Sequence, residues 1–152
     1  MDFEQYFKSP TRNRSVHHFR DLHFVDKKHG KFVGALLNSS LFFFWFVSIG
    51  NGRNITGTDV EQIPVGEIIE NLLTETSNVF DRLMRDYQKH SFIRKRQDCE
   101  FQEFRPSLSK NTIDDIDRLL AKHYGFTGEE LDSMINYDIK YRMGLGGEDE
   151  EE

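Results

Sequence analysis

The 152-residue chain contains little cysteine, proline or tryptophan, with one Cys, three Pro and one Trp. The single cysteine, Cys99, rules out a disulfide framework within the chain and a cysteine-based zinc site, and it is typical of a protein from a reducing compartment. The first residues also lack the basic and then apolar pattern of a secretory leader. We therefore expect a cytoplasmic protein.

Motifs of the common enzyme classes are missing as well. The chain has no glycine-rich phosphate loop, no Gly-x-Ser-x-Gly elbow and no His-Glu-x-x-His pair. His17, His18 and His23 lie near Asp21, but adjacent histidines point to opposite faces of a strand, which disfavours a shared metal. Asp138-Ile139-Lys140 matches a nuclease core only superficially, because it falls in a predicted helix. We expect no catalytic residue and no metal ligand.

The chain also lacks an uninterrupted apolar run of membrane-spanning length. A bilayer needs roughly 20 mainly apolar residues, whereas residues 32–47 are interrupted by Gly34, Asn38, Ser39 and Ser40. Apolar side chains in this stretch recur at three-four spacing, which predicts one buried helix over 32–47, and four further aromatics widen its apolar surface. We therefore expect a core helix and no membrane partner.

Charge is distributed unevenly along the chain. The net charge is −6, yet residues 1–31 carry seven basic and four acidic side chains, and residues 82–97 carry six basic and one acidic. Local patches matter more than the total charge for binding nucleic acid. The two basic islands are therefore compatible with DNA, although runs of charge are commonly only solvated surface.

The remaining patterns predict a mostly α (α+β) fold with a few short strands. We expect an extended arm over 16–25, a turn at 27–30, a long amphipathic helix of about 25 residues from Val65, a linker over 97–111, and a C-terminal helical pair that starts near Ile113 and at a Thr127–Glu130 capping box. This organisation gives four segments. They are a region at 1–65, the long helix with its basic end at 66–97, a helical appendage at 98–144 and a disordered acidic tail at 145–152.

The short segment after Gly50-Asn51-Gly52 carries side chains that can read DNA. Arg53 could bind guanine in a bidentate manner, Asn54 could bind adenine, and Thr56 could contact a phosphate or a thymine methyl group. A loop held by a rigid aromatic helix could insert such groups into a groove. The alternative is a polar turn that only reverses the chain.

Several of these residues also resemble a known family. Residues 36–42, Leu-Leu-Asn-Ser-Ser-Leu-Phe, followed by Arg53-Asn54-Ile55-Thr56 and Ile63-Pro64-Val65, resemble the target-recognition region of type IIG (Eco57I-like) restriction–modification enzymes, which are adenine-N6 DNA methyltransferases. The ends of many such polypeptides are similar to three motifs near the C-terminus: Ser109-Lys110, Ile113-x-x-Ile116-Asp117-x-Leu119-Leu120-Ala121-x-x-Tyr124-Gly125 and Ile135-Asn136-Tyr137-Asp138-Ile139-Lys140-Tyr141-Arg142-Met143-Gly144. The resemblance extends from about residue 19 to residue 144.

The chain departs from that family in an informative way. Its members carry an upstream methyltransferase with a cofactor-binding glycine motif and an Asn/Asp-Pro-Pro-Tyr/Phe motif, and neither motif occurs here. The resemblance therefore implies a C-terminal piece that binds no S-adenosylmethionine itself and works beside a methyltransferase domain in cis or in trans. Base flipping and methyl transfer would belong to that domain.

Together these observations lead to two hypotheses. The first is a non-catalytic DNA target-recognition and docking fragment that binds double-stranded DNA. Its candidate contacts are Arg12, Arg14, Arg53, Asn54, Thr56, Arg94, Lys95 and Arg96. The second is a protein–protein assembly module without DNA affinity, which the surplus aromatics and the apolar stripe of the long helix would favour.

Overall fold

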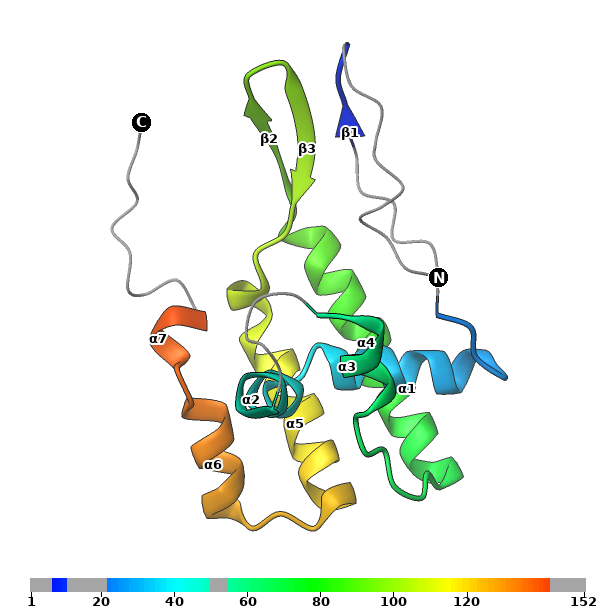
Figure 1. Cartoon of the computed structure of the whole chain (residues 1–152). Helices are drawn as coiled ribbons and strands as arrows, with labels where there is room; N and C mark the ends of the chain where they lie inside the picture. The colour runs from blue at the N-terminus through cyan, green and yellow to red at the C-terminus, as the bar shows by residue number, and fades with distance from the viewer. Residues whose placement is uncertain (1–6, 11–21, 50–54, 143–152) are drawn as a thin grey trace.

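A computed structural model describes residues 7–10, 22–49 and 55–142, and its fold is mostly α with one small antiparallel sheet. Figure 1 shows a body of helices from which a two-stranded hairpin rises. The expected mostly α (α+β) class is confirmed. The elements in chain order are β1 (Phe7–Lys8), α1 (Lys27–Leu37), α2 (Ser40–Ile49), α3 (Gly57–Glu61), α4 (Glu70–Lys89), β2 (Phe92–Arg96), β3 (Cys99–Glu103), a 3-10 turn η2 (Pro106–Ser109), α5 (Lys110–Tyr124), α6 (Gly128–Asn136) and α7 (Ile139–Arg142).

The hydrophobic core lies where α1, α4 and α5 pack together. Phe32 and Leu36 from α1, Leu83 from α4, and Ile116 and Leu120 from α5 are completely buried. α1 and α4 approach so closely that a Cβ at Gly34 would lie 2.6 Å from Cζ of Phe80. The segment expected as an appendage at 98–144 therefore contributes one of the three core helices.

The aromatic run forms two helices rather than the single helix predicted over 32–47. α1 and α2 are bent by 66° at Asn38 and Ser39. The Asn38 side-chain amide donates to the Gly34 carbonyl at 2.8 Å, and Ser39 Oγ accepts from the Phe42 backbone N–H at 3.0 Å. Asn and Ser compete for backbone groups in this way, and so they end one helix and start the next.

A buried carboxylate completes the start of α2. Asp117 of α5 is 2% exposed, and its Oδ1 accepts from the Ser40 backbone N–H at 2.8 Å. Burial raises the pKa of Asp117, against the opposing effects of hydrogen bonding from Ser40 and the charge of Arg142. Arg142 of α7 donates to Ser40 Oγ at 2.7 Å and lies over the ring of Phe43, 4.8 Å from its centroid. This network ties α2, α5 and α7 together.

The region around the second basic island also differs from the prediction. The long helix starts at Glu70 rather than near Val65 and ends at Lys89, and the stretch expected to continue it and then form a linker is the hairpin β2–β3. Lys27, predicted to lie in a turn, begins α1, because the Asp26 side chain accepts from the backbone N–H of His29 at 2.9 Å and caps that helix. Residues 22–25 form no strand, and the rest of the expected arm lies outside the described residues.

Two predicted helix ends are confirmed. Gly125 ends α5 in the left-handed conformation with φ 73°, and Thr127 and Glu130 form the reciprocal capping box that begins α6. In the described part of the chain, no single helix is long and apolar enough to cross a membrane, whereas α1 and α2 reach that length and composition only as a bent pair.

Candidate nucleic-acid interface

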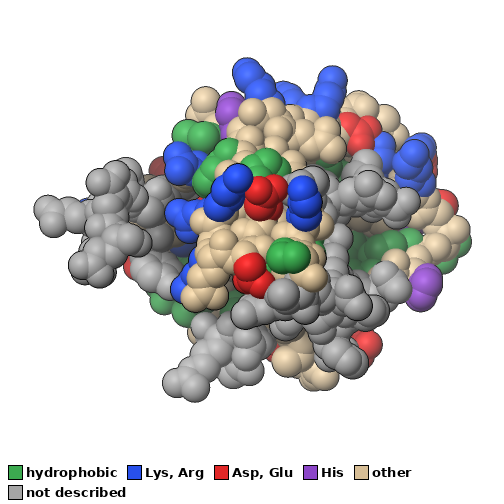
Figure 2. All heavy atoms as spheres, turned by 90° about the horizontal axis from the view of Figure 1, so that it is seen from above, with side chains coloured by type: hydrophobic (Ala, Val, Ile, Leu, Met, Phe, Trp, Pro, Cys, Tyr) green, Lys and Arg blue, Asp and Glu red, His purple; other side chains and the backbone are tan. Residues whose placement is uncertain are grey.

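The β2–β3 hairpin places the candidate residues Arg94, Lys95 and Arg96 on an exposed strand, not at the end of a helix. β3 is the central strand of the sheet, so β2 forms one edge and β1 pairs with the other side of β3. The two strands of the hairpin are joined by a turn at Gln97 and Asp98. Figure 2 looks down on this end of the molecule and shows Lys and Arg side chains with a few Asp and Glu between them.

Strand geometry separates the three basic side chains. Successive side chains of a strand point to opposite faces, so Arg94 and Arg96 share one face of the hairpin while Lys95 lies on the other. The charge cluster that is continuous in the sequence is therefore divided in the structure.

Two of the three cations have carboxylate partners on β3. Nε of Arg94 lies 3.2 Å from Glu103, and Nζ of Lys95 lies 2.9 Å from Glu100. These side chains remain 55% and 76% exposed. Exposed ion pairs contribute at most about 1 kcal/mol, so a phosphate could replace either carboxylate. Arg96 has no carboxylate partner among the residues that the structure describes.

One cation near the hairpin was not predicted from the sequence. Arg105, which follows β3, lies with its guanidinium 4.5 Å from the ring centroid of Phe92 at the start of β2. The side chain is exposed. The sequence alone predicts that residue 105 lies in a linker over 97–111, and no local sequence pattern connects it with Phe92. The pairing of β2 and β3 brings the two residues together.

Thr56 has a structural role that the sequence analysis did not assign to it. Its hydroxyl caps α3 by accepting from the Asp59 backbone N–H at 3.3 Å, and Asp59 accepts from the Thr56 N–H at 2.7 Å. Hydrogen bonds from Thr56 lower the pKa of Asp59 below its ordinary value. Thr56 is exposed, but α3 lies in the helical body and not on the hairpin (Figure 1). Thr56 and the basic strand therefore do not form one cluster.

Arg12, Arg14, Arg53 and Asn54 lie outside the described residues. Within the described part of the chain, no group of three His, Cys, Asp or Glu side chains is arranged to hold a metal ion.

Three basic side chains of the two islands form ion pairs within the helical body. Lys28 pairs with Glu70, Lys31 with Asp81 and Arg82 with Asp115. These contacts join α1 to α4 and α4 to α5, so part of the positive charge counted in the two islands serves the helical body. Arg94, Lys95 and Arg96, by contrast, lie on a hairpin that rises from that body (Figure 1).

No family model matches the chain, and no curated protein or solved structure matches it either.

Proposed function

We propose that this chain is a non-catalytic DNA target-recognition and docking fragment of a bacterial adenine-N6 restriction–modification protein. It binds double-stranded DNA, and a methyltransferase domain in cis or in trans supplies S-adenosylmethionine and the catalytic residues. The resemblance of residues 36–65 and 109–144 to such proteins supports the family part of this proposal. We propose the cytoplasm as the compartment in which the protein works.

The single observation that supports DNA binding best is the exposed basic face of the hairpin. Arg94 and Arg96 lie on that face of β2, and Arg105 lies close to its base beside Phe92. A two-stranded β ribbon fits the major groove of B-DNA, and arginine forms the most common specific contact there, with guanine. Arginine also binds phosphates, which position a protein without reading sequence.

A salt titration tests this function. Fluorescence anisotropy with a labelled duplex, measured between low and physiological salt, gives the slope of log affinity against log salt. Each lost phosphate contact should reduce the slope by about 0.9. The double variant Arg94→Ala/Arg96→Ala should therefore weaken binding and reduce the slope by about 2.

A matched variant controls for net charge. Arg118 and Lys122 are exposed on α5, away from the hairpin, and Arg118→Ala/Lys122→Ala removes the same charge. That variant should bind almost as the unchanged protein does. Equal loss in both double variants would show that only overall charge matters, and no binding at low salt would refute the proposal.

A second candidate function is protein–protein assembly. A mainly apolar hollow beside α2 is lined by Leu41, Trp45, Ile63, Pro64, Tyr124 and Phe126. A docking surface of this kind would suit a partner chain. Sedimentation that shows concentration-dependent association, together with no DNA affinity, would favour this alternative.

A further inference from the structure

The same face of the sheet that carries Arg94 and Arg96 also carries aromatic rings. The pairing register places Phe7 opposite Phe101, and Phe101 opposite Arg94. Directly opposed residues in antiparallel strands lie on the same face of the sheet. Phe92, two residues before Arg94, joins them by the same alternation.

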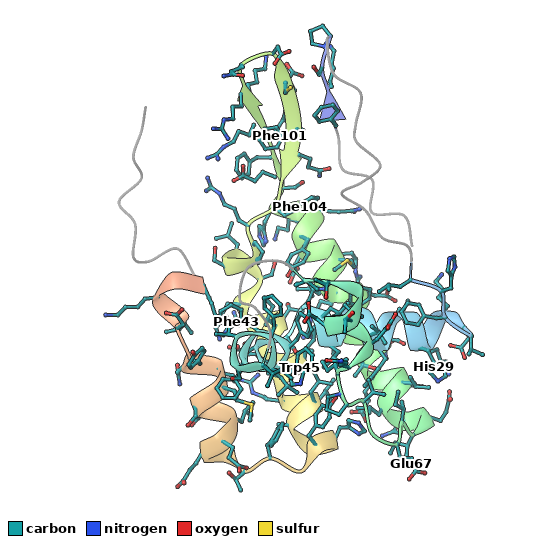
Figure 3. All side chains as sticks on the ribbon, viewed as in Figure 1. His29, Phe43, Trp45, Glu67, Phe101 and Phe104 are labelled. Atoms are coloured by element: carbon teal, nitrogen blue, oxygen red, sulfur yellow. The ribbon has the colours of Figure 1, made fainter. Side chains whose placement is uncertain are left out.

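These phenylalanines do not belong to the hydrophobic core. The core cluster consists of residues from α1, α4 and α5, and none of Phe7, Phe92 or Phe101 is part of it. All three are half-buried. Figure 3 shows Phe101 on the hairpin, away from Phe43 and Trp45 of α2 in the helical body.

The opposite face of the sheet has a different composition. The strand residues that the structure describes on that face are Lys8, Ile93, Lys95, Glu100 and Gln102, and none of these five is aromatic. The aromatic side chains are thus concentrated on the face that holds two arginines. The Phe92 ring already accepts a planar cation, the guanidinium of Arg105, at 4.5 Å.

Aromatic rings combined with cations are the chemistry of surfaces that bind unpaired nucleotides. Each base has a π face that can stack on a phenylalanine, while neighbouring arginines hold the phosphates. Contact with the phosphates of an intact duplex requires only the cations. Rings beside the arginines therefore point to a ligand whose bases are exposed.

We propose that the face formed by Phe92, Arg94, Arg96 and Phe101 binds single-stranded DNA, or a locally unpaired stretch, by stacking bases on its rings. The inference rests on the proposed DNA-binding function and specifies the class of DNA that this site prefers. The arginines supply the salt-dependent part of the affinity, and the rings supply a part that persists at high salt.

The test compares oligonucleotides that differ only in their bases. Anisotropy would be measured with a labelled single strand, the same strand with consecutive abasic sites, the corresponding duplex, and that duplex with a central mismatched bubble. The single strand and the bubble should bind more tightly than the abasic strand and the intact duplex. The preference should persist as salt is raised.

Substitutions at Phe101 separate stacking from folding. Phe101→Leu keeps an apolar side chain but removes the ring, and it should weaken binding of the single strand by about tenfold. Phe101→Tyr keeps the ring and should bind as the unchanged protein does. Both variants should have the circular dichroism spectrum and melting temperature of the parent within a few degrees, and Phe92→Leu provides a second variant if Phe101→Leu does not fold.

The outcomes distinguish this inference from the proposed function. Equal affinity for the normal and abasic strands, or equal affinity of the Leu and Tyr variants, would overturn base stacking. Duplex binding that depends on Arg94 and Arg96 would then still support the proposed function. Absence of binding to every oligonucleotide would overturn both.

Discussion

Replacement of Gly34 by alanine should destabilise the protein, because α1 and α4 meet there without space for a methyl group. A Cβ at this position would lie 2.6 Å from Cζ and 2.8 Å from Cε2 of Phe80. Phe80 is 8% exposed and belongs to the core cluster, so its ring has little room to move away. Overpacking of this kind typically costs about 1–3 kcal/mol.

Helix propensity opposes this cost and must be included. Alanine is favoured over glycine inside a helix by about 1 kcal/mol, so the observed loss for Gly34→Ala is the packing cost reduced by that gain. Gly128, at the start of α6, is the matched control, because a Cβ there meets no atom within 4 Å. We therefore expect Gly34→Ala to be less stable than Gly128→Ala by about 1–3 kcal/mol.

Urea denaturation followed by circular dichroism measures both variants on the same scale. Thermal denaturation offers a second measurement, because in a chain of this size a change of about 1 kcal/mol in the free energy of unfolding shifts the melting temperature by about 2–4 °C. A Phe80→Leu substitution should relieve the clash, so Gly34→Ala should cost less in that background than in the parent. Equal stability of Gly34→Ala and Gly128→Ala would refute the close packing of α1 on α4.

Three further changes test other parts of the fold. Gln97 has φ 55° in the hairpin turn, a conformation that costs a non-glycine residue about 1–2 kcal/mol. The substitution Gln97→Gly should therefore raise the melting temperature. A lower melting temperature would contradict the positive φ of this turn residue. Thr127→Ala removes the cap of α6 and should lower the free energy of unfolding by about 1 kcal/mol in urea denaturation; an unchanged midpoint would argue against the capping box. Asp117 has a raised pKa in the folded state, so above pH 3.8 the folded state binds more protons than the unfolded state. The free energy of unfolding of the parent, relative to that of Asp117→Asn, should therefore fall as the pH rises from 3.8 toward the raised pKa. Urea midpoints of both proteins at several acidic pH values measure this difference. A relative stability of the parent that rises with pH would refute the raised pKa of Asp117.

The helices were predictable where local signals agreed with tertiary packing. The apolar stripe of α4, the Gly125 stop and the Thr127–Glu130 box are local features, and the structure has all three. The bend between α1 and α2 also had a local signal in Asn38 and Ser39, but the surrounding aromatic residues favoured one continuous helix. Asp117, which completes the bend by accepting from Ser40, is distant in sequence and no periodicity connects the two.

The sequence alone does not predict the hairpin, because its strands are stabilised by pairing with each other and carry only a weak local strand pattern. Phe92–Arg96 alternates only weakly between apolar and charged residues, and the turn contains Gln97 rather than the glycine or asparagine that favours positive φ. For the candidate site, the sequence identified the basic residues but not their separation onto two faces. The shared face of Arg94 and Arg96 follows only from the strand, since successive residues of a helix are about 100° apart and residues 94 and 96 would lie on nearly opposite sides of it.

The ion pairs of the helical body and those of the hairpin differ in how a bound phosphate would affect the fold. In the described helical body, Lys28, Lys31 and Arg82 face carboxylates across helix boundaries, and a phosphate that displaced those carboxylates would break contacts between helices. On the hairpin, the partners of Arg94 and Lys95 lie on the adjacent strand, where backbone pairing holds the two strands together without the ion pairs. A phosphate that displaced Glu103 or Glu100 would therefore leave the backbone pairing of β2 with β3 in place. If DNA binds these described residues, it should do so with few phosphate contacts and a shallow salt dependence, and aromatic stacking would then decide how much affinity remains at physiological salt.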